Sequence, residues 1–150
     1  MKTEQFVTYE NISKALDISR DRYEHIVRYV MRMLKDYKGD VVDIVKEIPL
    51  NLKEKERYFT MYMMGHSSSS AFSRMNDKQK AAFIQSIMEV LKIDQEKAES
   101  ITYHMANETM EEMKRDHVPT VIETIKKVID SDFSEIEKDY ILFTHGLIYT

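Results

Sequence analysis

The sequence has no cysteine, and among its 150 residues only three are glycine and two are proline. The absence of cysteine excludes disulfides, thiolate metal sites and cysteine nucleophiles, and it is more typical of cytoplasmic than of secreted proteins. No apolar run reaches the roughly 18 residues of a membrane span. The first residues, MKTEQFVTYENISK, also lack the apolar segment of a secretory signal. We therefore expect a cytoplasmic protein without a membrane span, forming one domain over residues 1–150.

Helix-interrupting residues are scarce and 11 residues are methionine, which together indicate long helices around a deformable apolar core. No segment keeps the alternation of apolar and polar residues that is typical of a half-buried strand. We predict an all-α fold, a single compact domain of seven or eight helices. The expected ranges are 4–16, 20–37, 40–48, 53–64, 77–91, 95–116, 120–129 and a last helix that starts between 131 and 134.

Capping residues mark several of these boundaries. Ser19, Asn76 or Asp77, and Asp94 stand directly before amphipathic stretches, where a side-chain oxygen can accept a backbone N–H. Pro119 suits the first turn of the helix that follows it, because that turn needs no N–H donor there.

Positive charge is not concentrated anywhere in the chain. The formal net charge is −4, with 13 Lys and Arg against 11 Asp and Glu in residues 1–75, and 9 against 15 in residues 76–150. An autonomous nucleic-acid binder needs a concentrated basic surface, so nucleic acid is not an expected partner. The acidic second half suits a basic protein partner instead.

The stretch GHSSSSAFSRMN, residues 65–76, places a histidine beside four consecutive serines. A serine nucleophile needs a base within hydrogen-bond reach and usually a sharp turn such as G-x-S-x-G, which this stretch does not contain. Serine runs pack poorly and compete for backbone hydrogen bonds. We interpret the run as a solvated, flexible connection near residues 65–77, and we expect no catalytic residue and no enzyme activity.

The five histidines do not form a recognisable metal site. None belongs to the Glu-x-x-His pairs of di-iron helical bundles. Asp21 with His25 and His104 with Glu108 have helical i, i+4 spacing, but such pairs arise often by chance on polar faces. We expect no metal and no cofactor.

His66 has the most informative surroundings of the five histidines. If the helix containing YFTMYMMGH reaches it, the imidazole continues one apolar stripe that also carries tyrosines. It would then point inward, as a hydrogen-bonded core histidine or as a polar group of an internal cavity. Gly65 also permits an earlier end of that helix. The candidate ligand-binding residues are His66, Tyr62, Tyr29, Tyr103 and His104.

An internal repeat is an alternative description of the chain. A shift of 75 residues aligns Ile12, Leu16, Ile18, Glu24 and Ile26 with Ile87, Leu91, Ile93, Glu99 and Ile101, and both copies carry a capping residue at the same place. Matching KEKERYFTMYM with SEIEKDYILFT requires a larger shift, and amphipathic helices align easily when the register is free. A tandem pair of helical repeats is therefore the alternative to a globin-like packing.

The layout as a whole resembles a globin-type fold. Segments 20–37 and 95–116 would take the places of helices B and G, and NLKEKERYFTMYMMGH that of helix E. The segment in the haem-ligating place, DKQKAAFIQSIMEVLK, has no histidine, so the usual proximal bond to haem is impossible. In this respect the chain is similar to the haem-less globin sensor domains of bacterial signalling and sporulation regulators, which dimerise and in some cases hold a fatty-acyl ligand in a tunnel.

That resemblance implies a non-catalytic sensor or sequestering domain that binds a fatty-acyl or other apolar molecule and controls a signalling partner. A homodimer is expected through the carboxy-terminal helix, where Leu142 and Ile148 fall off the main apolar stripe and should be exposed. The alternative is a small helical adaptor, antitoxin-like or immunity-like, that binds another protein through its acidic second half.

Overall fold

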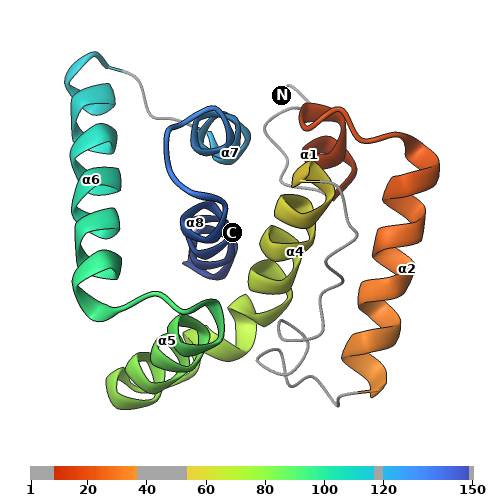
Figure 1. Cartoon of the computed structure of the whole chain (residues 1–150), viewed down its shortest axis with the longest axis horizontal. Coiled ribbons are helices and arrows are strands. Elements are labelled where there is room, and N and C mark those ends of the chain that lie inside the picture. The colour runs from red at the N-terminus through yellow and green to blue at the C-terminus, as the bar shows by residue number, and fades with distance from the viewer. Residues whose placement is uncertain (1–8, 37–53, 117–119, 149–150) are drawn as a thin grey trace.

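A computed structural model describes residues 9–36, 54–116 and 120–148, and throughout these ranges the chain forms helices and no strand (Figure 1). This confirms the predicted all-α fold. No helix of the described part is both long and apolar enough to cross a membrane. The predicted helix over 40–48 lies outside the described residues. The helices, labelled as in Figure 1, are α1 Tyr9–Ala15, α2 Arg20–Asp36, α4 Glu54–Ser73, α5 Asp77–Leu91, α6 Gln95–Lys114, α7 Val121–Ile129 and α8 Glu135–Ile148.

The capping residues set the starts of α5, α6 and α7. Asn76 Oδ1 accepts the N–H of Gln79 at 2.8 Å, and the Gln79 side chain accepts the N–H of Asn76 in return. Asp94 caps α6 as predicted. Thr120 caps α7, which begins at Val121, one residue after the predicted start. The predicted role of Pro119 lies outside the described residues.

The serine run is helical, so the predicted flexible connection at 65–77 is wrong for most of its length. α4 continues past the predicted end at residue 64 as far as Ser73. Within it, the Ser69 hydroxyl donates to the His66 carbonyl at 2.7 Å, and the Ser73 hydroxyl donates to the Ser70 carbonyl at 2.8 Å. Phe72, in the last turn, is buried and packs against Phe83 of α5. Tertiary packing therefore overrides the low helix preference of serine.

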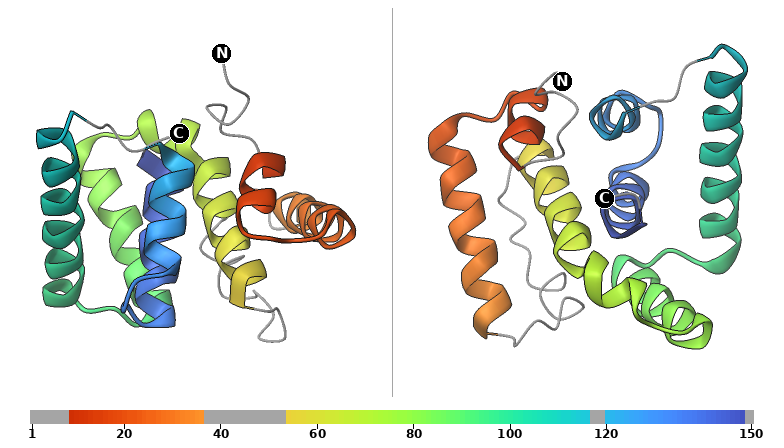
Figure 2. Two further views of the ribbon diagram at one scale, coloured as in Figure 1. Left: turned by 90° about the horizontal axis from the view of Figure 1, so that it is seen from above. Right: turned by 180° about the vertical axis from the view of Figure 1, so that it is seen from behind.

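α4 and α8 form the centre of the molecule, with α2 and α6 on opposite outer sides (Figures 1 and 2). The backbones of α4 and α8 meet at two glycines. A Cβ on Gly65 would lie 2.0 Å from the Phe143 carbonyl oxygen, and one on Gly146 would lie 2.5 Å from the Tyr62 carbonyl oxygen. Only glycine allows so close an approach of two helices. The central pairing of α4 with α8 does not test the predicted globin-like packing, which therefore stays a prediction.

The central place of α8 corrects one prediction and confirms another. Leu142 is buried, with 1% of its surface exposed, because it faces the interior beside α4. Ile148, in contrast, is 54% exposed at the end of the helix. Leu142 is therefore not available for the expected dimer contact.

The two halves of the chain repeat the same local geometry. α1 and α5 both end in a left-handed residue, Asp17 with φ 59° and Lys92 with φ 60°, which lie 75 positions apart. Each is followed by an isoleucine whose N–H donates five residues back at 2.9 Å, Ile18 to Ser13 and Ile93 to Met88. Both corners are thus the same C-terminal helix motif.

The contacts between helices repeat as well. Arg22 of α2 pairs with Glu56 of α4 at 2.8 Å. Lys97 of α6, 75 positions after Arg22, pairs with Glu137 of α8, 81 positions after Glu56, at 3.5 Å. Across the centre, Arg57 pairs with Asp139. The shift of 81 residues aligns Arg57 with Lys138 and Tyr58 with Asp139, and Lys138 in turn lies over the ring of Tyr58. Such reciprocal contacts are typical of a two-fold axis. The described helices therefore agree with a tandem pair of helical units related by an approximate two-fold axis.

Candidate ligand-binding groove

His66 and Tyr62 lie at the crossing of α4 and α8. Tyr62 is fully buried, and its ring is stacked on that of His66 with centroids 6.2 Å apart. His66 is half-buried, and this burial lowers the pKa of its imidazole. A Cβ on Gly146 would meet the backbone N of His66 at 2.9 Å, so helix backbone packs tightly beside this residue.

The other three predicted residues do not lie at this crossing. Tyr29 is half-buried on α2. Tyr103 on α6 is 70% exposed and lines a pocket between α6 and the helices α5 and α8. His104 is also exposed on α6, where it bonds Glu108 at 3.1 Å and meets the ring of Phe133 edge-on. The structure therefore brings His66 and Tyr62 together but does not gather all five residues around one cavity.

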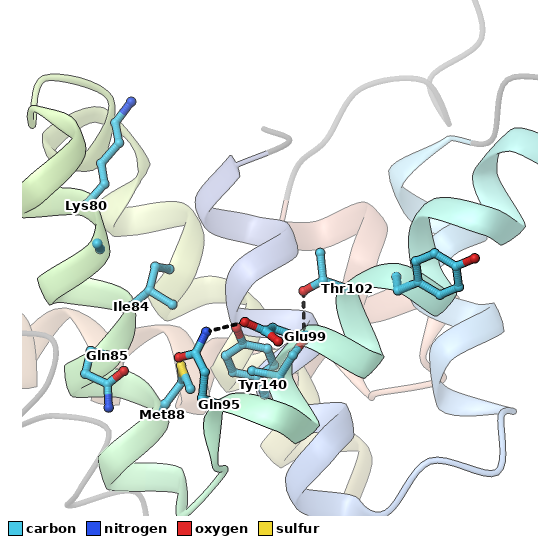
Figure 3. Close-up of a pocket in the computed structure, with 11 residues that line it drawn as sticks. Lys80, Ile84, Gln85, Met88, Gln95, Glu99, Thr102 and Tyr140 are labelled. Carbon is cyan, nitrogen blue, oxygen red and sulfur yellow. Dashed lines mark hydrogen bonds between the residues drawn. The ribbon is translucent and has the colours of Figure 1, made fainter.

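The apolar space in the described part of the chain lies instead between α6 and the helices α5 and α8. A pocket of about 610 Å³ opens there, shown in Figure 3, and its lining includes Ile84, Met88, Ala98, Thr102 and Tyr140. A second pocket, of about 360 Å³, shares Ile84, Thr102 and Tyr140 with the first. It continues between α6 and α8, where its lining includes Ile101 and Met105 of α6 and Ile141, His145 and Ile148 of α8. We call the two together the α6 groove. Its volume and apolar lining are those of a small-molecule site.

Comparison with the first half shows one difference at the groove. In that half, Tyr23 of α2 packs its ring against Phe59 of α4 with centroids 6.0 Å apart. The equivalent positions, 75 and 81 residues later, are Ala98 of α6 and Tyr140 of α8, and both line the groove. A methyl group thus stands where the first half has a phenol ring, and the space is left open.

The hydroxyl groups of the groove differ in whether they form hydrogen bonds within the protein. Thr102 donates to the Ala98 carbonyl and Thr144 to the Tyr140 carbonyl, each at 2.9 Å, so these donors are used within their own helices. Tyr140 is only 6% exposed, and burial raises the pKa of its phenol. No residue of the described ranges forms a hydrogen bond with its hydroxyl.

His145 lies farther along the groove and is held neutral. Burial in apolar surroundings lowers its pKa to about 4. It lines the second pocket together with Thr144 and Ile148. At neutral pH the groove interior therefore has no charge from this histidine.

A more polar pocket of about 810 Å³ lies on the other side of α6, towards α7 and α8. Four of its charged groups form ion pairs, Lys97 with Glu137 at 3.5 Å and Lys127 with Glu108 at 3.3 Å, and Asp130 and Asp132 also line it. Within the described ranges no group of three or more His, Asp or Glu side chains is placed to hold a metal ion. This charged and partly paired lining suits solvent contact.

Sequence reasoning did not identify Tyr140 or Ala98 as part of a site. The signal that could have found them is the repeat, because a large-to-small change from Tyr23 to Ala98 appears once the halves are aligned. Comparison of the chain with protein-family models, with curated proteins and with solved structures finds no match.

Proposed function

We propose that the protein is a non-catalytic sensor or sequestering domain that binds an apolar small molecule in the α6 groove and controls a partner protein. The observation that supports this most directly is the change from Tyr23 to Ala98 at positions that the 75-residue shift aligns. A protein that only needed a solid helical core would gain stability by filling this space. The resemblance in layout to haem-less globin sensors points to the same class of function.

α6 also offers a way to pass the bound state to a partner. This helix lines the groove through residues that include Ala98, Thr102 and Met105, while its Met110 and Met113 are exposed outside the groove lining. Large exposed apolar side chains at helical spacing are typical of interaction surfaces. We place the signalling partner, or a second copy of the chain, on this exposed face, where a ligand that displaces α6 would alter binding.

The Ala98→Tyr variant tests the proposal. The new ring should occupy the groove against Tyr140 as Tyr23 does against Phe59, which should raise stability by about 1 kcal/mol through apolar burial. Binding of an uncharged apolar dye such as Nile red, followed by fluorescence titration, should weaken at least about tenfold, which corresponds to 1.4 kcal/mol.

Ala82→Tyr is the matched control, because Ala82 is exposed on α5 and should leave dye binding unchanged. If the wild-type protein binds no apolar probe, or if Ala98→Tyr binds it as tightly as wild type, the groove does not serve as a ligand site.

A further inference from the structure

Tyr140 presents its hydroxyl to the open space of the α6 groove. Its side chain is largely buried and lines both pockets of the groove, and Figure 3 shows it among Gln95, Glu99 and Thr102. No described residue forms a hydrogen bond with this hydroxyl, so it is available to a molecule in the groove. The threonines around it already donate to backbone carbonyls. A bound molecule with one hydrogen-bonding oxygen would therefore be held at Tyr140.

The charges around the groove do not favour an ionic ligand. Among the described residues that line the second pocket, none is Asp, Glu, Lys or Arg, and His145 is neutral. An ion placed there would lose its hydration without gaining a counter-charge.

At the mouth of the first pocket, Lys80 and Glu99 have opposite charges, and both are engaged by the protein. Lys80 Nζ lies 5.6 Å from the centroid of the Phe72 ring, and Glu99 accepts a hydrogen bond from Gln95 at 3.0 Å. The surrounding half of the chain carries 15 acidic against 9 basic residues, which repels anions.

Resting on the proposed function, we propose that the ligand of the α6 groove is an uncharged single-chain amphiphile, such as an alkyl alcohol, aldehyde or ester. Its oxygen forms a hydrogen bond with the Tyr140 hydroxyl. Its alkyl chain lies in the second pocket, along Ile101 and Ile141 towards Ile148. A free fatty acid is therefore a poorer ligand than the alcohol of the same length.

A matched octyl series tests this with the full-length protein. We would measure displacement of Nile red by 1-octanol, octanoate, octylammonium and 1-chlorooctane at pH 7.5. Octanol should bind at least about five times more tightly than each of the two ions. The Tyr140→Phe variant should lose about five-fold in octanol affinity, the usual worth of one neutral hydrogen bond, and keep its affinity for chlorooctane.

The outcomes separate the two proposals. If octanoate binds as tightly as octanol, or if Tyr140→Phe leaves octanol affinity unchanged because water satisfies the hydroxyl, the assignment of an uncharged ligand held at Tyr140 is wrong and the groove remains a ligand site. If none of the four probes displaces the dye and Ala98→Tyr has no effect on dye binding, the proposed function fails as well. Far-UV circular dichroism of Tyr140→Phe checks that the variant is folded.

Discussion

The fold strongly affects the ionisation of Asp139. Its side chain is almost completely buried, with Oδ2 accepting from Arg57 Nε at 2.7 Å. Burial outweighs the attraction of Arg57 and raises the pKa of Asp139 to about 6, with a smaller contribution from Glu135. Since this pKa is higher in the folded than in the unfolded chain, the contribution of Asp139 to the free energy of unfolding decreases as pH rises from about 4 through 6.

Replacing Arg57 by methionine should therefore have an effect that depends on pH. At pH 7.5 the buried carboxylate would be ionised without its partner, and we expect a loss of about 3–5 kcal/mol in the free energy of unfolding. At pH 5 the carboxyl can take up a proton, so the loss should be smaller. Urea denaturation at the two pH values measures both.

Lys55→Met is the control for that substitution, because Lys55 is exposed on the same helix. It should change stability little at either pH. An equal loss for Arg57→Met at pH 5 and pH 7.5 would show that the ionisation of Asp139 is not the cause.

At the scale of single elements, α4 shows how far packing can override local preference. Its C-terminal part contains four serines in succession, which the sequence suggests is a connection. In the fold, Gly65 fits against Phe143 on one side of the crossing, and Phe72 is buried farther along. The serine segment between these two anchored positions is held in the helix, and only the short turn before Asn76 links α4 to α5.

Proline at Ser69 distinguishes a helix from a flexible connection. Within a helix it removes a backbone hydrogen bond and clashes with the preceding turn, which should cost about 3 kcal/mol or more. Ser69→Ala, which removes only the bond from the hydroxyl to the His66 carbonyl, should change stability by less than about 1 kcal/mol. Thermal denaturation of both variants measures the difference, and a Ser69→Pro protein as stable as wild type would contradict the helix.

At the scale of the whole molecule, the described helices of the two halves bury their central helices, α4 and α8, against each other. α4 belongs to the first half and α8 to the second, and the fully buried Tyr62 and Phe143 lie where these helices meet. Neither half can cover this surface alone. At the aligned positions, Tyr23 packs its ring against Phe59 beside α2, whereas Ala98 and Tyr140 line an open pocket beside α6, and this difference marks the candidate ligand groove.

Separating the chain between residues 75 and 76 tests this organisation. We expect fragments 1–75 and 76–150 to be weakly helical or aggregated alone, because each exposes its central helix, and to recover the helical signal of the intact chain when mixed. Far-UV circular dichroism of each fragment and of the mixture measures this. A second fragment carrying Gly146→Leu should fail to complement, since its side chain would meet the backbone of Tyr62. If each fragment alone were monomeric and as helical as the intact chain, the two halves would not need each other to cover their central helices, and the expectation would be wrong.

Much of the secondary structure could be predicted because its causes are local. The caps Asn76 and Asp94 bond to N–H groups three residues away, so the starts of α5 and α6 are encoded in a few neighbouring positions. The all-α fold follows in the same way from periodicity and from the scarcity of glycine and proline. The 75-residue match also marked a real repetition of helix ends.

The sequence by itself thus determined the helices, most of their boundaries and the absence of cysteine chemistry. Only the tertiary structure decided that the serine run is helical, that Leu142 is buried, and that open space lies beside Ala98 and Tyr140. The physical reason is distance along the chain. A cap depends on residues within one turn, whereas burial and cavities depend on side chains from helices that are far apart in sequence.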